Sequence, residues 1–182
     1  LPPLTAGLDY PPFDNPSRAA SSFGVSRVEH PGTLAAAVAA ALDHDGKVLI
    51  EEAVPGVEVG CAVLGSDRLT VGRVDEIELD HGFFDYVEKY NLITSRIHMP
   101  APISSDQERA VQELSMRLYR CLECSGFARV DLFLTPEGRL VFNEINTIPG
   151  FTSHSRYPRM MEGVGLSFSP LLDTLIGLAV TA

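Results

Sequence analysis

The most informative segment lies near the C-terminal end, where the sequence is Arg129-Val130-Asp131-Leu132-Phe133-Leu134, then Thr135-Pro136-Glu137-Gly138, then Arg139-Leu140-Val141-Phe142-Asn143-Glu144-Ile145-Asn146. Two strand-like runs around a turn of proline and glycine predict an antiparallel hairpin. A turn centred between residues 137 and 138 would place Asp131 opposite Glu144. Arg129 would then lie opposite Asn146, with all four side chains on one face of the sheet.

Two facing carboxylates repel each other unless a cation lies between them. Mg2+ prefers oxygen ligands and commonly shares its coordination shell with substrate phosphates. We therefore expect Asp131, Glu144 and Asn146 to bind a divalent metal beside a nucleotide. An isolated acidic pair on a strand is usually only solvated, and the amide and the arginine on the same face favour the metal.

The composition limits the kinds of partner. The chain has 182 residues, a formal net charge of -10, no tryptophan and two lysines, Lys47 and Lys89. The length suits one domain or two small ones. The acidic balance argues against a nucleic-acid or an anionic-membrane surface. A phosphate site in this chain must depend on arginine, metal, backbone N-H groups and Lys89.

Three cysteines form no secreted-type disulfide framework, which favours a reducing compartment. Cys121 and Cys124 have redox-like or zinc-like spacing, but no second ligand pair accompanies them, so buried thiols are the better interpretation. We see no signal peptide and no apolar run of about 18 residues, and we expect a cytoplasmic protein.

The periodicity of the remaining sequence predicts mixed helices and strands. Capping-box spacing from Ser105 to Glu108 marks a helix that ends near residues 122–124. Residues 82–96 keep no period and are expected to form a large functional loop. The other expected elements are a helix at 33–44, strands at 47–50, 57–64, 69–74 and 77–79, and helices at 156–162 and 170–180.

Several motifs occur together, in an order and spacing that are more specific than any one of them. They are Ser21-Ser22-Phe23-Gly24-Val25, Ile50-Glu51-Glu52, Glu58-Val59-Gly60-Cys61-Ala62-Val63, Glu88-Lys89-Tyr90, Gly126-Phe127-Ala128-Arg129-Val130-Asp131 and Asn143-Glu144-Ile145-Asn146-Thr147-Ile148-Pro149-Gly150-Phe151-Thr152-Ser153-His154-Ser155. From about Tyr10 onward the chain resembles the D-alanine-D-alanine ligases of the ATP-grasp superfamily, especially the vancomycin-resistance branch that makes D-alanyl-D-serine. The resemblance implies an α+β ATP-grasp fold, an antiparallel sheet with flanking helices. Residues 1–50 would belong to the central subdomain and 51–182 to the C-terminal domain.

The resemblance also implies ATP and Mg2+ (or Mn2+) as cofactors and a chemistry in cell-wall precursor synthesis. ATP would phosphorylate the carboxylate of one D-alanine, and the amine of a second D-amino acid would attack the acyl phosphate. By the same resemblance, Arg129 and the Gly150 backbone N-H stabilise the oxyanion, and Ser21 and Tyr90 form a polar network near the first substrate. Glu51 contacts adenine, Glu58 the ribose and Phe83 the base, Lys89 reaches phosphate, and Ser155 and Lys89 hold the second substrate's carboxylate.

The chain departs from the family pattern at Asn15, which stands at a phosphate-binding lysine, and at Ala20, which stands at a loop glycine. The family's N-terminal domain has no counterpart here, so the chain corresponds to a ligase fragment. Three hypotheses follow: a ligase region, a nucleotide-binding module without catalysis, or an unrelated two-metal hydrolase. The expected partners are small molecules, namely D-alanine or D-serine, and D-lactate is expected to be a poor acceptor. We expect no nucleic-acid or membrane partner, and we expect the intact parent to form a homodimer.

Overall fold

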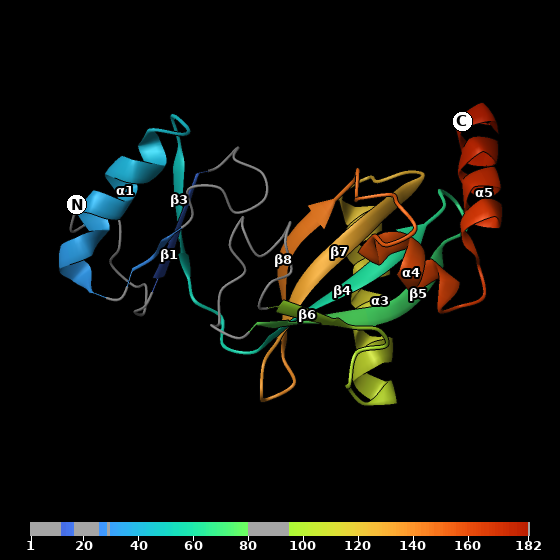
Figure 1. Ribbon diagram of the computed structural model, residues 1–182, viewed down its shortest axis with the longest axis horizontal. Coiled ribbons are helices and arrows are strands. Elements are labelled where there is room, and N and C mark those ends of the chain that lie inside the picture. Colours follow the sequence, from blue (N-terminus) through green and yellow to red (C-terminus); the bar gives the residue numbers. More distant parts are fainter. Residues whose placement is uncertain (1–11, 17–25, 29, 80–94, 182) are drawn as a thin grey trace. The chain divides into compact units, whose positions relative to one another are not determined.

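The computed structural model describes residues 12–16, 26–28, 30–79 and 95–181 and shows two compact units (Figure 1). The first unit comprises Leu1–Val54 and Leu79–Ser95, and the second comprises Pro55–Glu78 and Arg96–Ala182. The domain boundary expected after residue 50 stays a prediction. The grouping of Leu79–Ser95 with the first unit was not anticipated from the sequence.

The first unit contains a small antiparallel sheet with strand order β2-β1-β3, formed by β1 (Pro12–Pro16), β2 (Ser26–Arg27) and β3 (Val48–Glu52). A 3-10 turn, η1 (Pro31–Thr33), leads into α1 (Leu34–Leu42), which contacts β1 and β3. The helix expected at 33–44 and the strand expected at 47–50 are thus confirmed with small shifts at their ends. Glu51 lies in β3 opposite Phe13.

The second unit is built on a five-stranded sheet with the order β6-β5-β4-β7-β8. Its strands are β4 (Val57–Leu64), β5 (Thr70–Leu79), β6 (Ser95–His98), β7 (Phe127–Leu134) and β8 (Leu140–Asn146). The pairs β4-β5, β4-β7 and β7-β8 are antiparallel. One sequence prediction was wrong here, because β5 is one continuous strand rather than two short runs. The loop expected at 82–96 overlaps β6 at its last two residues, 95 and 96. Most of that loop lies outside the described residues.

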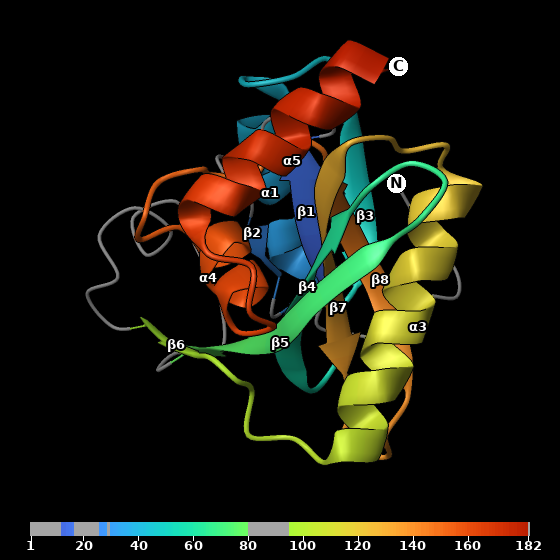
Figure 2. The same cartoon turned by 90° about the vertical axis from the view of Figure 1, so that its right-hand side faces the viewer.

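One face of this sheet packs against α3 (Ser105–Cys121), as Figure 2 shows. The contact is apolar, and its buried members include Val59, Cys61, Val63, Val111, Tyr119, Val130 and Leu132. The helix begins after Ser104, whose hydroxyl accepts from the Gln107 N-H at 3.2 Å while the Gln107 side chain accepts from the Ser104 N-H at 3.0 Å. The capping pair expected at Ser105 and Glu108 was therefore wrong by one residue at each position. The Glu108 carboxylate instead accepts a hydrogen bond from Arg73 at 2.7 Å.

The opposite face of the sheet carries α4 (Arg156–Glu162) and α5 (Phe168–Thr181) (Figure 2). These helices cover one end of the face, where Ala62, Leu64, Tyr157, Met160, Met161 and Leu171 are buried together. The Tyr157 hydroxyl donates to the Val63 carbonyl at 3.0 Å, which ties α4 to β4. The other end of the same face is charged. Among the described residues, no helix combines the length and the apolar character needed to cross a lipid bilayer.

Candidate functional site

The β7-β8 hairpin has the predicted pairing at the residues that matter. Asp131 lies opposite Glu144, and Arg129 lies opposite Asn146. Closer to the turn the register differs, because Leu132 pairs with Phe142 and leaves Asn143 as an extra residue in β8. Such a bulge decides which face the following side chains occupy. In an uninterrupted register Glu144 would instead lie opposite Val130, on the face covered by α3.

Asp131 is fully buried, and its carboxylate is bound by Arg129. The Arg129 Nε lies 2.9 Å from each carboxylate oxygen, and its Nη2 lies 2.8 Å from Oδ2. Glu144 is exposed on the edge strand, and the Asn146 Oδ1 accepts from the Ile148 N-H at 3.1 Å. One face of the hairpin therefore carries a buried carboxylate, an exposed carboxylate, an amide oxygen and a guanidinium.

Arg156, the first residue of α4, contributes a second guanidinium to this face. Its Nε donates to the Asp75 Oδ2 at 2.8 Å, and its Nη2 donates to the Asp75 Oδ1 at 2.7 Å. The same Nη2 lies 3.3 Å from the Asp131 Oδ1, and Nη1 lies 3.9 Å from the Glu58 Oε1. Burial alone would lower the pKa of Arg156, but the surrounding carboxylates outweigh burial, so its pKa lies above the ordinary value. We call Glu58, Asp75, Asp131 and Arg156 the buried charge cluster.

The cluster needs a glycine at its centre. Gly60 of β4 pairs with Asp75 of β5 on one side and with Asp131 of β7 on the other. A Cβ at Gly60 would lie 2.7 Å from the Asp75 Oδ1 and 3.0 Å from the Asp131 Oδ1, and closer still to the Arg156 guanidinium. Because Gly60 has no side chain, the Asp75 and Asp131 carboxylates and the Arg156 guanidinium can occupy the space beside it.

The loop between β8 and α4 brings together two further predicted residues. The Ser155 Oγ accepts from the Thr152 N-H at 3.0 Å and lies 2.9 Å from the Thr152 hydroxyl. A Cβ at Gly150 would lie 3.1 Å from the same Oγ. Gly150 and Ser155 therefore lie close together, and Ser155 directly precedes Arg156 in the sequence.

The remaining predicted residues are distributed differently. Glu58 belongs to the buried charge cluster, whereas Glu51 lies in the first unit. The structure does not describe Ser21, Phe83, Lys89 or Tyr90, nor Ala20. Asp75 and Arg156 were missed by the sequence reasoning. Arg156 directly follows the predicted site residue Ser155, and this position could have indicated that Arg156 lies near the site. No local sequence pattern placed Asp75 beside Gly60.

The hairpin donors suit a hard cation. Within the described parts of the chain, no three His, Cys, Asp or Glu side chains are grouped to hold a metal ion. The predicted set differs from such a group because it has two carboxylates and one amide. All three offer oxygen on one face of adjacent strands, and oxygen is the donor that Mg2+ prefers.

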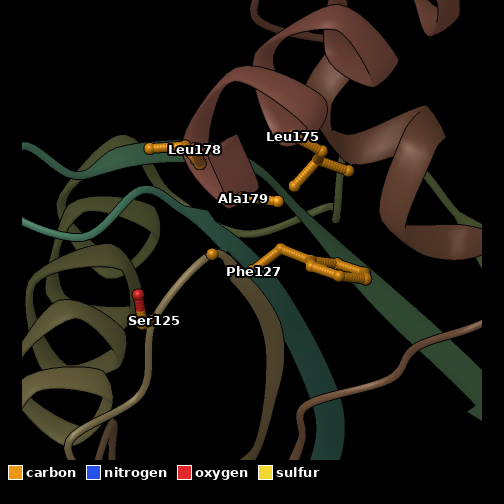
Figure 3. A pocket seen from close by; sticks show the side chains of 6 residues that line it. Ser125, Phe127, Leu175, Leu178 and Ala179 are labelled. Carbon is orange, nitrogen blue, oxygen red and sulfur yellow. The ribbon is translucent and has the colours of Figure 1, made fainter. Parts of the chain in front are cut away.

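A pocket on the same unit has a different character. Its lining comes from the two residues before β7, from the first residue of β7 and from α5, namely Ser125, Gly126, Phe127, Leu175, Leu178 and Ala179 (Figure 3). None of these residues is charged. The pocket therefore offers no charged side chain for a phosphate, a metal or a carboxylate substrate.

Comparisons with known proteins were consistent with one another. A family model described as "D-ala D-ala ligase C-terminus" matches residues 3–177. The vancomycin B-type resistance protein VanB of Enterococcus faecalis is 48% identical over 183 residues, covering 98% of this chain and 54% of that protein. A putative D-alanine-D-lactate ligase of Streptomyces coelicolor is 49% identical, covering 96% of this chain and 52% of that protein.

Among solved structures, the VanG D-Ala:D-Ser ligase from Enterococcus faecalis matches with a TM-score of 0.90 and 59% identity. The match covers 97% of this chain and 52% of that structure's chain. The chain thus spans about half the length of the curated relatives that it matches.

Proposed function

Because the chain belongs to the D-alanine-D-alanine ligase family and has the α+β ATP-grasp fold of that family, we propose that it forms the ATP- and Mg2+-binding part of a D-amino-acid ligase. The complete reaction would join the carboxylate of D-alanine to the amine of a second D-amino acid at the expense of ATP. The observation that carries the proposal is the hairpin register, since it supports one set of oxygen donors beside an arginine.

In this proposal Asp131, Glu144 and Asn146 would hold Mg2+, and the metal would supply positive charge near the phosphate oxygens of ATP. Arg129 lies beside these residues and would stabilise negative charge that develops on the transferred group or on the oxyanion, together with the Gly150 N-H. Ser155 would hold the second substrate's carboxylate, and Glu58 and Glu51 would contact the nucleotide. Four further residues have roles proposed from the family resemblance alone. Ser21 and Tyr90 would form a polar network near the first substrate, Phe83 would contact the base, and Lys89 would reach phosphate and the second substrate's carboxylate.

For the second substrate we propose an amine acceptor, D-serine or D-alanine. The 59% identity with a D-Ala:D-Ser ligase favours D-serine. The 49% identity with a putative D-lactate ligase makes the acceptor a question for direct measurement. Product analysis of the intact parent enzyme, supplied with D-alanine, D-serine and D-lactate together, tests it. Mostly D-alanyl-D-lactate at neutral pH would contradict an amine acceptor.

The metal proposal is tested on this chain by Mn2+ relaxation enhancement in the presence of ATP. We expect Glu144→Gln to weaken Mn2+ binding roughly tenfold or more, because a ligand charge is lost. Glu113→Gln is the matched control, since Glu113 is exposed on α3, the helix that packs against the other face of the sheet. Equal Mn2+ affinity of the wild type and Glu144→Gln would overturn the proposal.

A further inference from the structure

Arg156 is shared unequally between two buried carboxylates. Asp75 receives two short hydrogen bonds in the forked geometry that guanidinium and carboxylate prefer. Asp131 receives a single longer contact of 3.3 Å from Nη2. Both aspartates are fully buried, and the Arg156 side chain is 11% exposed. Because buried charges need partners, each of these three groups depends on the others.

The unequal sharing has a consequence for Asp131. Arg129 already contacts both oxygens of this carboxylate, at 2.9 Å each. If Asp75 carried no charge, Asp131 would be the nearest ionised partner of Arg156, since Glu58 lies farther away at 3.9 Å. Two guanidinium groups would then compete with a cation for the same two oxygens.

We propose that Asp75 is a positioning residue of the metal site: it binds the Arg156 guanidinium through both carboxylate oxygens and so prevents that guanidinium from closing on Asp131. This inference rests on the proposed metal role of Asp131. The register of the sheet supports it, because Gly60 separates Asp75 from Asp131 across three adjacent strands and leaves Arg156 room to lie between them.

The test compares Mn2+ affinity, with ATP present, among variants of this chain. Asp75→Asn keeps the size of the side chain and removes its charge, and it should weaken Mn2+ binding roughly tenfold although Asp75 is not a ligand. Adding Arg156→Met removes the competing guanidinium. The double variant should return to within about threefold of the wild-type affinity, a non-additive result expected only of coupled groups.

The control is Glu108→Gln. Glu108 forms a similar forked pair with Arg73, also in β5, at 2.7 and 3.1 Å, but this pair joins β5 to α3. Loss of that carboxylate should lower the thermal stability and leave Mn2+ affinity within about threefold of the wild type. A general effect of breaking an ion pair is thereby separated from an effect on the metal site.

The outcomes distinguish this inference from the proposed function. If Glu144→Gln weakens Mn2+ binding but Asp75→Asn does not, the inference alone fails. If the double variant binds as weakly as Asp75→Asn, the role is structural and the inference is again wrong. If Glu144→Gln has no effect, both fail. Should Asp75→Asn not fold, the double variant decides, because near-wild-type affinity supports the inference and a tenfold loss overturns it.

Discussion

At the scale of single residues, the buried charge cluster exists because one position of β4 has no side chain. We expect Gly60→Ala to lower the free energy of unfolding by about 1–3 kcal/mol, since its Cβ would press on Asp75, Asp131 and Arg156. Urea unfolding followed by circular dichroism measures this loss. Gly177→Ala is the control, because nothing lies within 4 Å of its Cβ position in α5, and it should be neutral or stabilising. Equal effects at the two glycines would contradict the crowding at Gly60.

Cys61 should make stability fall at alkaline pH. Burial raises the pKa of this thiol from 9.0 to about 12. Because the folded pKa exceeds the unfolded one, the contribution to stability is complete below pH 9 and is lost as the pH rises toward 12. Between pH 8 and 10.5 the wild type should lose about 2 kcal/mol more than Cys61→Ala. Urea unfolding at both pH values measures the difference, and parallel losses in the two proteins would refute this role of Cys61.

Local sequence could identify the hairpin residues but not the whole cluster. Asp131, Glu144 and Asn146 belong to two runs joined by a short turn, so alternation and turn position relate them directly. Asp75 and Arg156 are 81 residues apart in the sequence and meet only through the strand order and the docking of α4. Period-2 patterns do not specify strand order, which is why these two residues were missed.

At the scale of elements, the bulge at Asn143 explains how the correct pairing was predicted from an incorrect turn. The prediction assumed one continuous register from a turn centred between residues 137 and 138. The structure has Leu134 opposite Leu140, a turn centred on Glu137, and then one extra residue that restores the expected pairs. Asn143 shows no local sequence feature that marks a bulge, so the site pairs were right and the register near the turn was wrong.

The strand β5 was predicted as two pieces for a physical reason that the structure explains. Two consecutive acids, Asp75 and Glu76, interrupt the apolar pattern, and acidic residues are uncommon within strands. In the structure, Arg156 pairs with Asp75, so a buried acid is accommodated within a continuous strand. Partners that are distant in sequence can therefore reverse the local preference of a residue.

The start of α3 offers a test with adjacent serines. Ser104→Ala should destabilise the second unit by about 1 kcal/mol, because it removes the hydroxyl that accepts from the Gln107 N-H. Ser105→Ala should cost much less, since Ser105 is already inside the helix. Thermal unfolding of the two variants under the same conditions measures the difference. A larger effect at Ser105 would show that the helix begins one residue later.

At the scale of the whole molecule, Glu51 lies in the first compact unit, and the three proposed metal donors all lie in the second. The chain also spans about half the length of its curated relatives. Because the proposed metal donors all lie in one unit, we expect metal binding to be separable from synthesis. Binding needs groups present in this chain, whereas synthesis needs substrates oriented with high accuracy, and orientation contributes more to rate than a single hydrogen bond does.

Asn15→Lys tests this separation. Asn15 lies in β1 opposite Leu49, where the family resemblance expects a phosphate-binding lysine. A charged hydrogen bond of about 1.5–3 kcal/mol would tighten ATP by roughly ten- to a hundredfold, and we expect a smaller but measurable gain. Calorimetry measures ATP affinity, and a phosphate-release assay with D-alanine measures synthesis, which should stay undetectable. Clear dipeptide formation by this single variant, without added protein, would show that the missing cation was the only defect.

The glycine at the centre of the buried charge cluster also restricts how this lineage can evolve. A side chain at Gly60 would crowd Asp75 and Arg156. A neutral residue at Asp75 would remove the main ion pair of Arg156, and a shorter residue at Arg156 would remove the guanidinium that Asp75 and Asp131 share. Single steps away from the present combination therefore pass through impaired intermediates. Homologues should accordingly keep Gly60, Asp75 and Arg156 as a set or replace them together. The three positions would then change together during evolution, although they lie on three separate elements, β4, β5 and α4.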